Sequence, residues 1–185
     1  MDHFKFFETA YFNEIDRKQQ IENNLTMPIG AIAAAFGVLG YYFTHFQFDA
    51  TKPIFATALL TIFVLGSLGA FGLLCFSVYW CLRLAVSTTY EYLPGSETLQ
   101  KYYDNLKNWH VIKNKRLGVK NADQEFQDYL ISAMTFCGQH NWQRNNVRSE
   151  MLSKAKTFAS YALVALALVA ISYYVSFWYN PIQSK

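Results

Sequence analysis

Charged residues are scarce in this chain of 185 amino acids. Asp, Glu, Lys and Arg make up 16% of the sequence, whereas 52% is hydrophobic and 18% is aromatic. The apolar excess is concentrated in blocks, which indicates a membrane protein rather than a soluble domain with a large core. The formal net charge of +3 is too small for a dedicated nucleic-acid-binding domain. A net charge of this size is compatible only with local contact with anionic lipid or nucleic acid.

Cysteine is scarce as well. Cys75, Cys81 and Cys137 are too scattered for a disulfide framework, and two of them lie inside an apolar run. We therefore expect free thiols in a reducing compartment. Residues 1–25 mix aromatic, acidic and basic side chains and lack the uninterrupted apolar stretch of a cleavable signal peptide. We expect the first membrane span itself to direct insertion.

The motifs of enzymes and metal sites are also missing. Cys137 and His140 form a Cys-x-x-His pair, but no second pair stands at the spacing of a zinc site. His3, His45 and His110 are isolated, with no neighbour that suggests a nucleophile and its base. No His-Glu-x-x-His, Walker or nucleotide-binding motif occurs. The sequence therefore predicts a protein that is not an enzyme, has no cofactor and acts on no small-molecule substrate.

Three apolar runs are long enough to cross a bilayer: residues 27–48, 54–86 and 158–179. A span needs about 20 residues, so the second run is longer than necessary. Either it tilts, or its C-terminal part emerges into water with Arg83 reaching the headgroups; we favour emergence. The short connection between the first two runs requires them to be antiparallel.

Ionisable groups are nearly absent from the interiors of these runs, which contain hydroxyl groups at most. Transporters usually keep an acid, a base or a broken helix at mid-depth. A single copy is therefore a poor transporter, although an oligomeric pore lined by hydroxyls and small residues stays open.

Small residues four apart in the first two runs predict close helix packing. The glycines at 66, 69 and 72 superficially resemble a phosphate-binding loop, but no strand flanks them. Packing within the chain is the favoured interpretation, and oligomerisation is the alternative. The residues assigned to helix packing are Gly30, Ala33, Gly37, Gly66, Gly69 and Ala70.

The distribution of Lys and Arg predicts the topology. Most basic residues lie between positions 88 and 156, whereas the first hairpin loop has only Lys52 and the C-terminal tail only Lys185. The positive-inside rule then places the N-terminus and residues 87–156 in the cytoplasm, with the C-terminus on the opposite side of the membrane. The predicted fold is an all-α membrane protein with three transmembrane helices and long cytosolic helical extensions. Its parts are a cytosolic amphipathic helix (1–26), a two-span hairpin (27–86), a cytosolic helical hairpin (87–156) and a third span with a short tail (157–185).

The cytosolic parts have their own patterns. The N-terminal helix is expected to continue into the first span, and residues 90–95 predict a turn. A helix over 96–106, capped by Gly95 or Ser96, should follow, and then a basic loop. Lys113, Lys115 and Arg116 in that loop are candidates for phosphate or lipid contact, with a solvated loop as the more favoured interpretation. A second helix starting at Asn121 or Asp123 is expected to run unbroken into the third span.

An apolar stripe on that second helix becomes polar before the third span begins. It runs into Asn141, Asn145 and Arg148, at positions i, i+4 and i+7. One interpretation is a polar latch between helices that faces the N-terminal helix and the emergent end of the second span. The alternative is a solvated face, with Arg148, Lys154 and Lys156 touching lipid phosphates.

Two short motifs carry a resemblance to a known group. They are Asn-x-x-x-Asn-x-x-Arg-Ser-x-x-Leu-x-Lys-Ala, from Asn141 to Ala155, and Asp-Arg-Lys-Gln-x-Ile-x-Asn-x-Leu-x-x-Pro-Ile-Gly, from Asp16 to Gly30. With the order of spans, they make the chain similar to small transmembrane effectors encoded beside retron reverse transcriptases and in other antiphage operons.

The resemblance implies an abortive-infection effector, a toxin that perturbs the inner membrane when a sensor partner releases it. The implied partners are the lipid bilayer and either further copies of the chain or a sensor such as a reverse transcriptase with its RNA–DNA product. A non-toxic membrane scaffold and a small transporter subunit are the alternatives.

Overall fold

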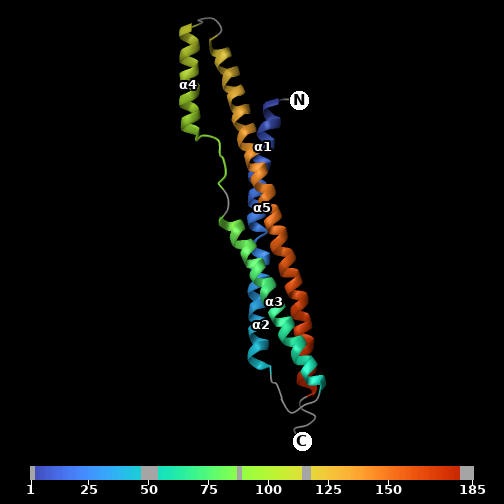
Figure 1. Cartoon of the computed structure of the whole chain (residues 1–185). Coiled ribbons are helices and arrows are strands. Elements are labelled where there is room, and N and C mark those ends of the chain that lie inside the picture. Colours follow the sequence, from blue (N-terminus) through green and yellow to red (C-terminus); the bar gives the residue numbers. More distant parts are fainter. Residues whose placement is uncertain (1–2, 47–53, 87–88, 114–117, 180–185) are drawn as a thin grey trace. The chain divides into compact units, whose positions relative to one another are not determined.

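The computed structural model describes residues 3–46, 54–86, 89–113 and 118–179. Within these ranges the regular structure is helical throughout: α1 (His3–Asn23), α2 (Thr26–His45), α3 (Ile54–Val86), α4 (Ser96–Lys113) and α5 (Gly118–Tyr179) (Figure 1). The predicted all-α class is confirmed for this part of the chain. Three helical stretches are long and apolar enough to cross a membrane: His3–His45, Thr57–Val86 and Asn121–Ser176.

The chain divides into two compact units. The first unit comprises Met1–Ile21 and Thr88–Val147, and the second comprises Glu22–Ser87 and Arg148–Lys185. Helices α1 and α5 therefore each contribute residues to both units, and the candidate membrane-spanning parts of α2, α3 and α5 belong to the second.

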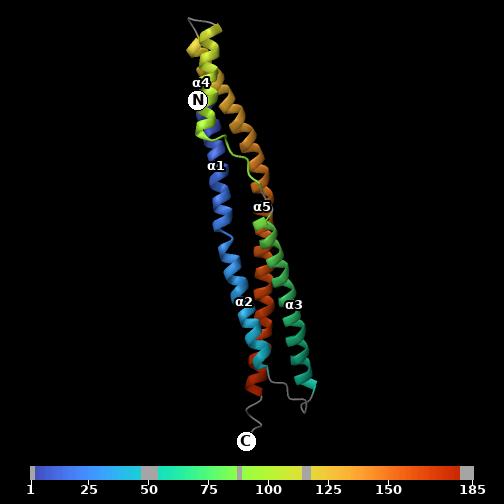
Figure 2. The ribbon, with the colours of Figure 1, turned by 90° about the vertical axis from the view of Figure 1, so that its left-hand side faces the viewer.

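The second unit is a three-helix bundle in which α3 runs antiparallel to α2 and to residues 148–179 of α5 (Figure 1, Figure 2). The buried positions of α3 stand alternately four and three residues apart: Phe63, Ser67, Ala70, Leu74, Ser77, Cys81 and Leu84. This is the heptad spacing of left-handed helix packing. Facing them in the core are Ala155, Ala159 and Ala162 of α5 and Ile32, Ala35 and Leu39 of α2. Alanines along the α5 face allow its backbone to approach its neighbours closely.

The sequence predicted that the N-terminal helix continues into the first span without a break. The structure shows a break between them. Helix α1 ends at Asn23 and α2 begins at Thr26, with two turn residues between them. Pro28 causes the break because it has no N–H to donate to the carbonyl of Asn24. Leu25 nevertheless keeps helical angles (φ −76°, ψ −26°), and its N–H bonds to the carbonyl of Glu22 at 3.2 Å. The interruption is therefore confined to about one turn. The predicted end of this span at residue 48 lies outside the described residues.

The hairpin of α4 and α5 is longer at both helix ends than the sequence suggested. Helix α4 extends to Lys113 rather than residue 106, and α5 begins at Gly118 rather than at Asn121 or Asp123. The basic residues did not stop these helices because Lys is a good helix former. The two helices pack through Tyr102 and Tyr103 against Phe126, with ring centroids 6.3 and 5.2 Å apart.

Residues 89–95, between α3 and α4, form no turn, contrary to expectation. They have no regular secondary structure, and we call them the strap. The strap ends at Gly95, whose carbonyl accepts the first bond of α4 from the N–H of Leu99 at 3.0 Å. Gly95, rather than Ser96, is therefore the residue that caps α4.

Candidate functional site

Hydrogen bonds hold the strap along most of its length. Four consecutive residues, from Tyr90 to Leu93, each bond to a side chain of α1 or α5. Tyr90 and Tyr92 bond through their hydroxyl groups. Glu91 and Leu93 bond through backbone N–H groups, which need such partners because an irregular segment lacks those that a helix or sheet supplies.

Asn141 on α5 holds the backbone of the strap. Its Oδ1 accepts the N–H of Glu91 at 3.1 Å, and its Nδ2 donates to the carbonyl of the same residue at 2.8 Å. The Asn141 side chain is fully buried. An amide carries a donor and an acceptor side by side, so it pairs with a peptide group as a neighbouring β-strand would. An apolar residue here would leave both groups of Glu91 without these partners.

Asn145, one turn further along α5, joins three segments. Its Nδ2 donates to the backbone carbonyl of Glu14 at 2.7 Å and to Oε2 of the same residue at 2.9 Å. Its Oδ1 accepts the hydroxyl of Tyr90 at 2.6 Å. Asn145 is also fully buried. The two amides thus connect the strap with Glu14 of α1, and all of these residues belong to the first unit.

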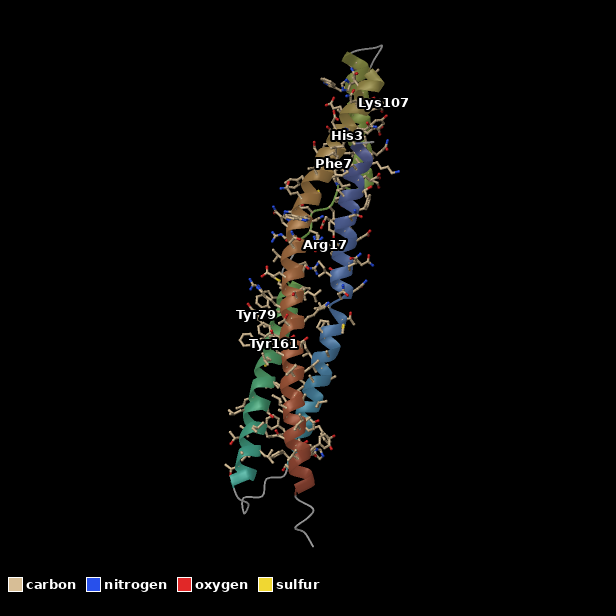
Figure 3. All side chains as sticks on the ribbon, turned by 90° about the vertical axis from the view of Figure 1, so that its right-hand side faces the viewer. His3, Phe7, Arg17, Tyr79, Lys107 and Tyr161 are labelled. Atoms are coloured by element: carbon tan, nitrogen blue, oxygen red, sulfur yellow. The ribbon has the colours of Figure 1, made fainter. Side chains whose placement is uncertain are left out.

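Helix α1 supplies the other contacts to the strap. The ammonium of Lys18 donates to the hydroxyl of Tyr92 at 2.8 Å and lies 4.8 Å from the ring centroid of Tyr90. The N–H of Leu93 donates to the hydroxyl of Tyr11 at 3.3 Å. Nearby, Arg17 donates to Oδ1 of Asn146 at 2.8 Å (Figure 3 labels Arg17 on α1). Strap, α1 and α5 are therefore joined by polar contacts from both helices.

An apolar cluster lies beside these polar contacts. Tyr11, Met134 and Cys137 are buried together, with Phe7 and Leu93 packed against them. Burial, and secondly the charge of Glu91, raise the pKa of the Cys137 thiol. A thiol of this kind stays protonated and unreactive at neutral pH.

The third residue of the predicted latch, Arg148, belongs to the second unit. Its guanidinium is 4% exposed and donates from two nitrogens to Oε1 of Glu22, each at 3.2 Å. Asn145 and Arg148 therefore both bond to acidic residues of α1, and all three stripe residues are buried. The partner of Asn141 was not foreseen, because a backbone group of an irregular segment leaves no periodic signal in a sequence.

The residues predicted for helix packing fall into two groups. Gly66 lies against α5, where a Cβ would stand 3.0 Å from Cγ2 of Val169, and Ala70 is fully buried in the core. Gly30, Gly37 and Gly69 face open space within the described part of the chain, and Ala33 is exposed. Only Gly66 and Ala70 of the six thus contribute to packing inside one copy of the chain.

Of the basic residues predicted to contact phosphate or lipid, Lys115 and Arg116 lie outside the described residues. Lys113 is the last residue of α4, and its side chain is not described either.

Lys18, which contacts the strap, was missed by sequence reasoning, although a signal existed. Five residues of α1 that contact the strap, α5 or the apolar cluster stand alternately three and four residues apart: Phe4, Phe7, Tyr11, Glu14 and Lys18. A polar residue at such a position escapes a search for apolar periodicity alone.

The contacts of this site hold α1, α5 and the strap together. Among the described residues, no group of three or more His, Cys, Asp or Glu side chains is arranged to hold a metal ion. No protein-family model, curated protein or solved structure matches the chain. Its function is therefore inferred from the geometry of its own residues.

Proposed function

We propose that the chain is a membrane effector of a bacterial antiphage system, which perturbs the inner membrane when a sensor partner releases it. The observation that carries this proposal is the strap, whose four central residues are held by side-chain hydrogen bonds from α1 and α5. In the proposed topology the first unit is cytoplasmic and the C-terminus is periplasmic. A C-terminal reporter that works only in the periplasm tests this orientation, and a silent reporter contradicts it.

A clamp built from hydrogen bonds suits a protein that must be held and then released. Each such bond contributes only about 0.5–1.5 kcal/mol net, because water or a partner can replace it. In this proposal, release of the clamp is passed on to α3, the candidate membrane span that precedes the strap in the sequence. A clamp of five hydrogen bonds gives a two-state element whose states differ by a few kcal/mol, which is the range that a binding partner can shift.

The proposed sensor binds the exposed surface of the first unit. A reverse transcriptase carrying its RNA–DNA product is the candidate implied by the resemblance of the sequence. Helix α4 and the first part of α5 offer this partner exposed aromatic side chains, among them Trp109, Phe136 and Trp142. Aromatic residues of this kind are typical anchors of protein interfaces.

A non-toxic scaffold is the rival function. The heptad-packed core of the second unit would suit a rigid anchor equally well. A transporter subunit is less favoured, because Arg83 is the only charged residue of α3 and lies near its end.

Expression in a bacterial host separates effector from scaffold. Wild-type chain, expressed alone, is expected to stop growth and depolarise the membrane, as followed with a potential-sensitive dye. Asn141→Ala weakens the clamp and should bring the onset of depolarisation forward at equal membrane abundance. Gln143→Ala, at an exposed position of the same helix, is the matched control and should behave as wild type. Normal growth and potential with all three chains would favour the scaffold.

A further inference from the structure

A shallow groove of about 380 Å³ lies between α3 and α5 within the second unit. It takes no part in the strap and its contacts. Aromatic residues form most of its wall, and the lining also includes two aliphatic hydroxyl groups and one ammonium group. The lining residues are Phe76, Tyr79, Trp80, Ser153, Lys154, Thr157 and Phe158 (Figure 3 labels Tyr79).

One end of the groove is cationic. The ammonium of Lys154 lies 4.6 Å from the ring centroid of Trp80, and the guanidinium of Arg83 lies 5.4 Å from the same centroid. Two cations therefore share one indole ring. The counter-charge is Glu150, whose carboxylate is 2.7 Å from Lys154. Both members of that pair are partly exposed, so the pair is weak and a better anion can compete for Lys154.

The other end of the groove is apolar. The rings of Phe76 and Phe158 are stacked, with centroids 5.5 Å apart. No charged residue occurs in α3 between Ile54 and Phe76, or in α5 between Phe158 and Tyr179. The groove thus runs from cations to apolar rings in the same direction along both helices, with Trp80 between the two ends.

We propose that this groove binds one anionic phospholipid. Its phosphate lies against Lys154 and the hydroxyls of Ser153 and Thr157, and an acyl chain lies along Phe76 and Phe158. The inference rests on the membrane location proposed above, but not on toxicity or on a sensor.

The two ends of the groove together select this occupant. A free anion would use the cations but gains nothing from the stacked phenylalanines. A neutral lipid would use the rings but gains little from two cations. Indole rings and basic side chains are also the groups that proteins place at the level of lipid headgroups.

Lipid retention by the full-length chain tests the proposal. The chain is reconstituted into vesicles of phosphatidylcholine and phosphatidylglycerol at three to one, floated to isolate inserted protein, and extracted into mild detergent. Phospholipid retained per chain is then measured by mass spectrometry. Wild type should retain phosphatidylglycerol above its share in the vesicles, and Lys154→Gln should reduce that enrichment about fivefold. Phe76→Ala should lower the retention of the lipid as a whole.

Lys156→Gln is the matched control, since it removes the same charge two residues along the same helix but outside the groove. Its retention should equal that of wild type. Equal losses in both lysine variants, or no enrichment in wild type, would overturn the proposal. The proposal would also be overturned, in favour of a free-anion site, by a third result. In that result millimolar inorganic phosphate removes the retained phospholipid, and Phe76→Ala has no effect. Failure of the chain to float would contradict the membrane location itself, which distinguishes the two failures.

Discussion

The side-chain amide of Asn141 and the backbone of Glu91 exchange two hydrogen bonds, 3.1 and 2.8 Å long, as residues of paired β-strands do. This pairing fixes the register of the strap, because a shift by one residue would break both bonds together. The amide is fully buried, whereas the residue that it holds is at the surface. The strap is therefore anchored from inside the first unit and remains accessible from outside.

Replacing Asn141 by Leu is expected to loosen the strap. Leu has the same branched shape but offers neither donor nor acceptor, so the N–H and C=O of Glu91 lose their partners. We expect the strap to lose about 2 kcal/mol of local stability. Hydrogen exchange of the purified chain measures this directly, and the amides of Glu91 and Leu93 should exchange at least tenfold faster. Unchanged exchange would show that Asn141 does not hold the strap; Gln143→Leu, on an exposed position, serves as the control.

The thiol of Cys137 provides a reporter for the same event. It is 6% exposed and lies in the cluster that includes Leu93 of the strap. Because burial and Glu91 raise its pKa, alkylation by iodoacetamide should be slow at neutral pH. The alkylation rate should begin to increase at a higher pH than it does for an exposed thiol. In a chain with Cys75 and Cys81 replaced by Ala, Asn141→Leu should accelerate labelling at pH 7.5. Equal labelling rates with and without that substitution would contradict a closed strap.

The raised pKa also has a consequence for stability. The neutral form of the Cys137 thiol is favoured in the folded chain. Its contribution to the free energy of unfolding is therefore fully present below the ordinary pKa of a thiol. That contribution is lost as the pH rises through the raised pKa of the folded chain. The first unit should therefore unfold more easily above about pH 9. The chain with Cys137→Ala should lose this part of the pH dependence.

The sequence predicts the helices better than the contacts between them. The span of α3 follows from one long apolar run, and its bounds at residues 54 and 86 agree with the structure. The ends of α4 and α5 were misplaced because basic residues add no apolar period to the sequence there. The partner of Asn141 was out of reach for a different reason: its contacts are with peptide groups, and every residue has the same peptide group.

The pair formed by Arg148 and Glu22 should respond asymmetrically to mutation. Glu22→Ala removes the carboxylate from a guanidinium that is only 4% exposed, which we expect to cost about 3 kcal/mol of unfolding free energy. Arg148→Met keeps the apolar volume, and the Glu22 side chain, 47% exposed, can return to water, so the cost should be about 1 kcal/mol. Thermal unfolding in mild detergent measures both. Glu150→Ala breaks an exposed pair and should leave the midpoint unchanged, and equal losses for Glu22→Ala and Arg148→Met would contradict the burial argument.

Two glycines of α3 should respond to alanine in opposite directions. At Gly66 a Cβ would stand 3.0 Å from Cγ2 of Val169, a fully buried and stiff side chain, so Gly66→Ala should lower stability by about 1 kcal/mol. At Gly69 a Cβ meets open space, and Gly69→Ala should raise helix stability by about 0.5–1 kcal/mol.

Thermal unfolding in mild detergent compares the two variants, and the size of the detergent complex reports association between copies. Gly66→Ala should leave that size unchanged, because its effect lies inside one chain. If Gly69→Ala instead reduces the size of the complex, the open face of α3 contacts a second copy, and the oligomer interpretation of the small residues gains its first support. If both alanines raise the unfolding midpoint equally, α3 and α5 do not approach as closely at Gly66 as the structure indicates.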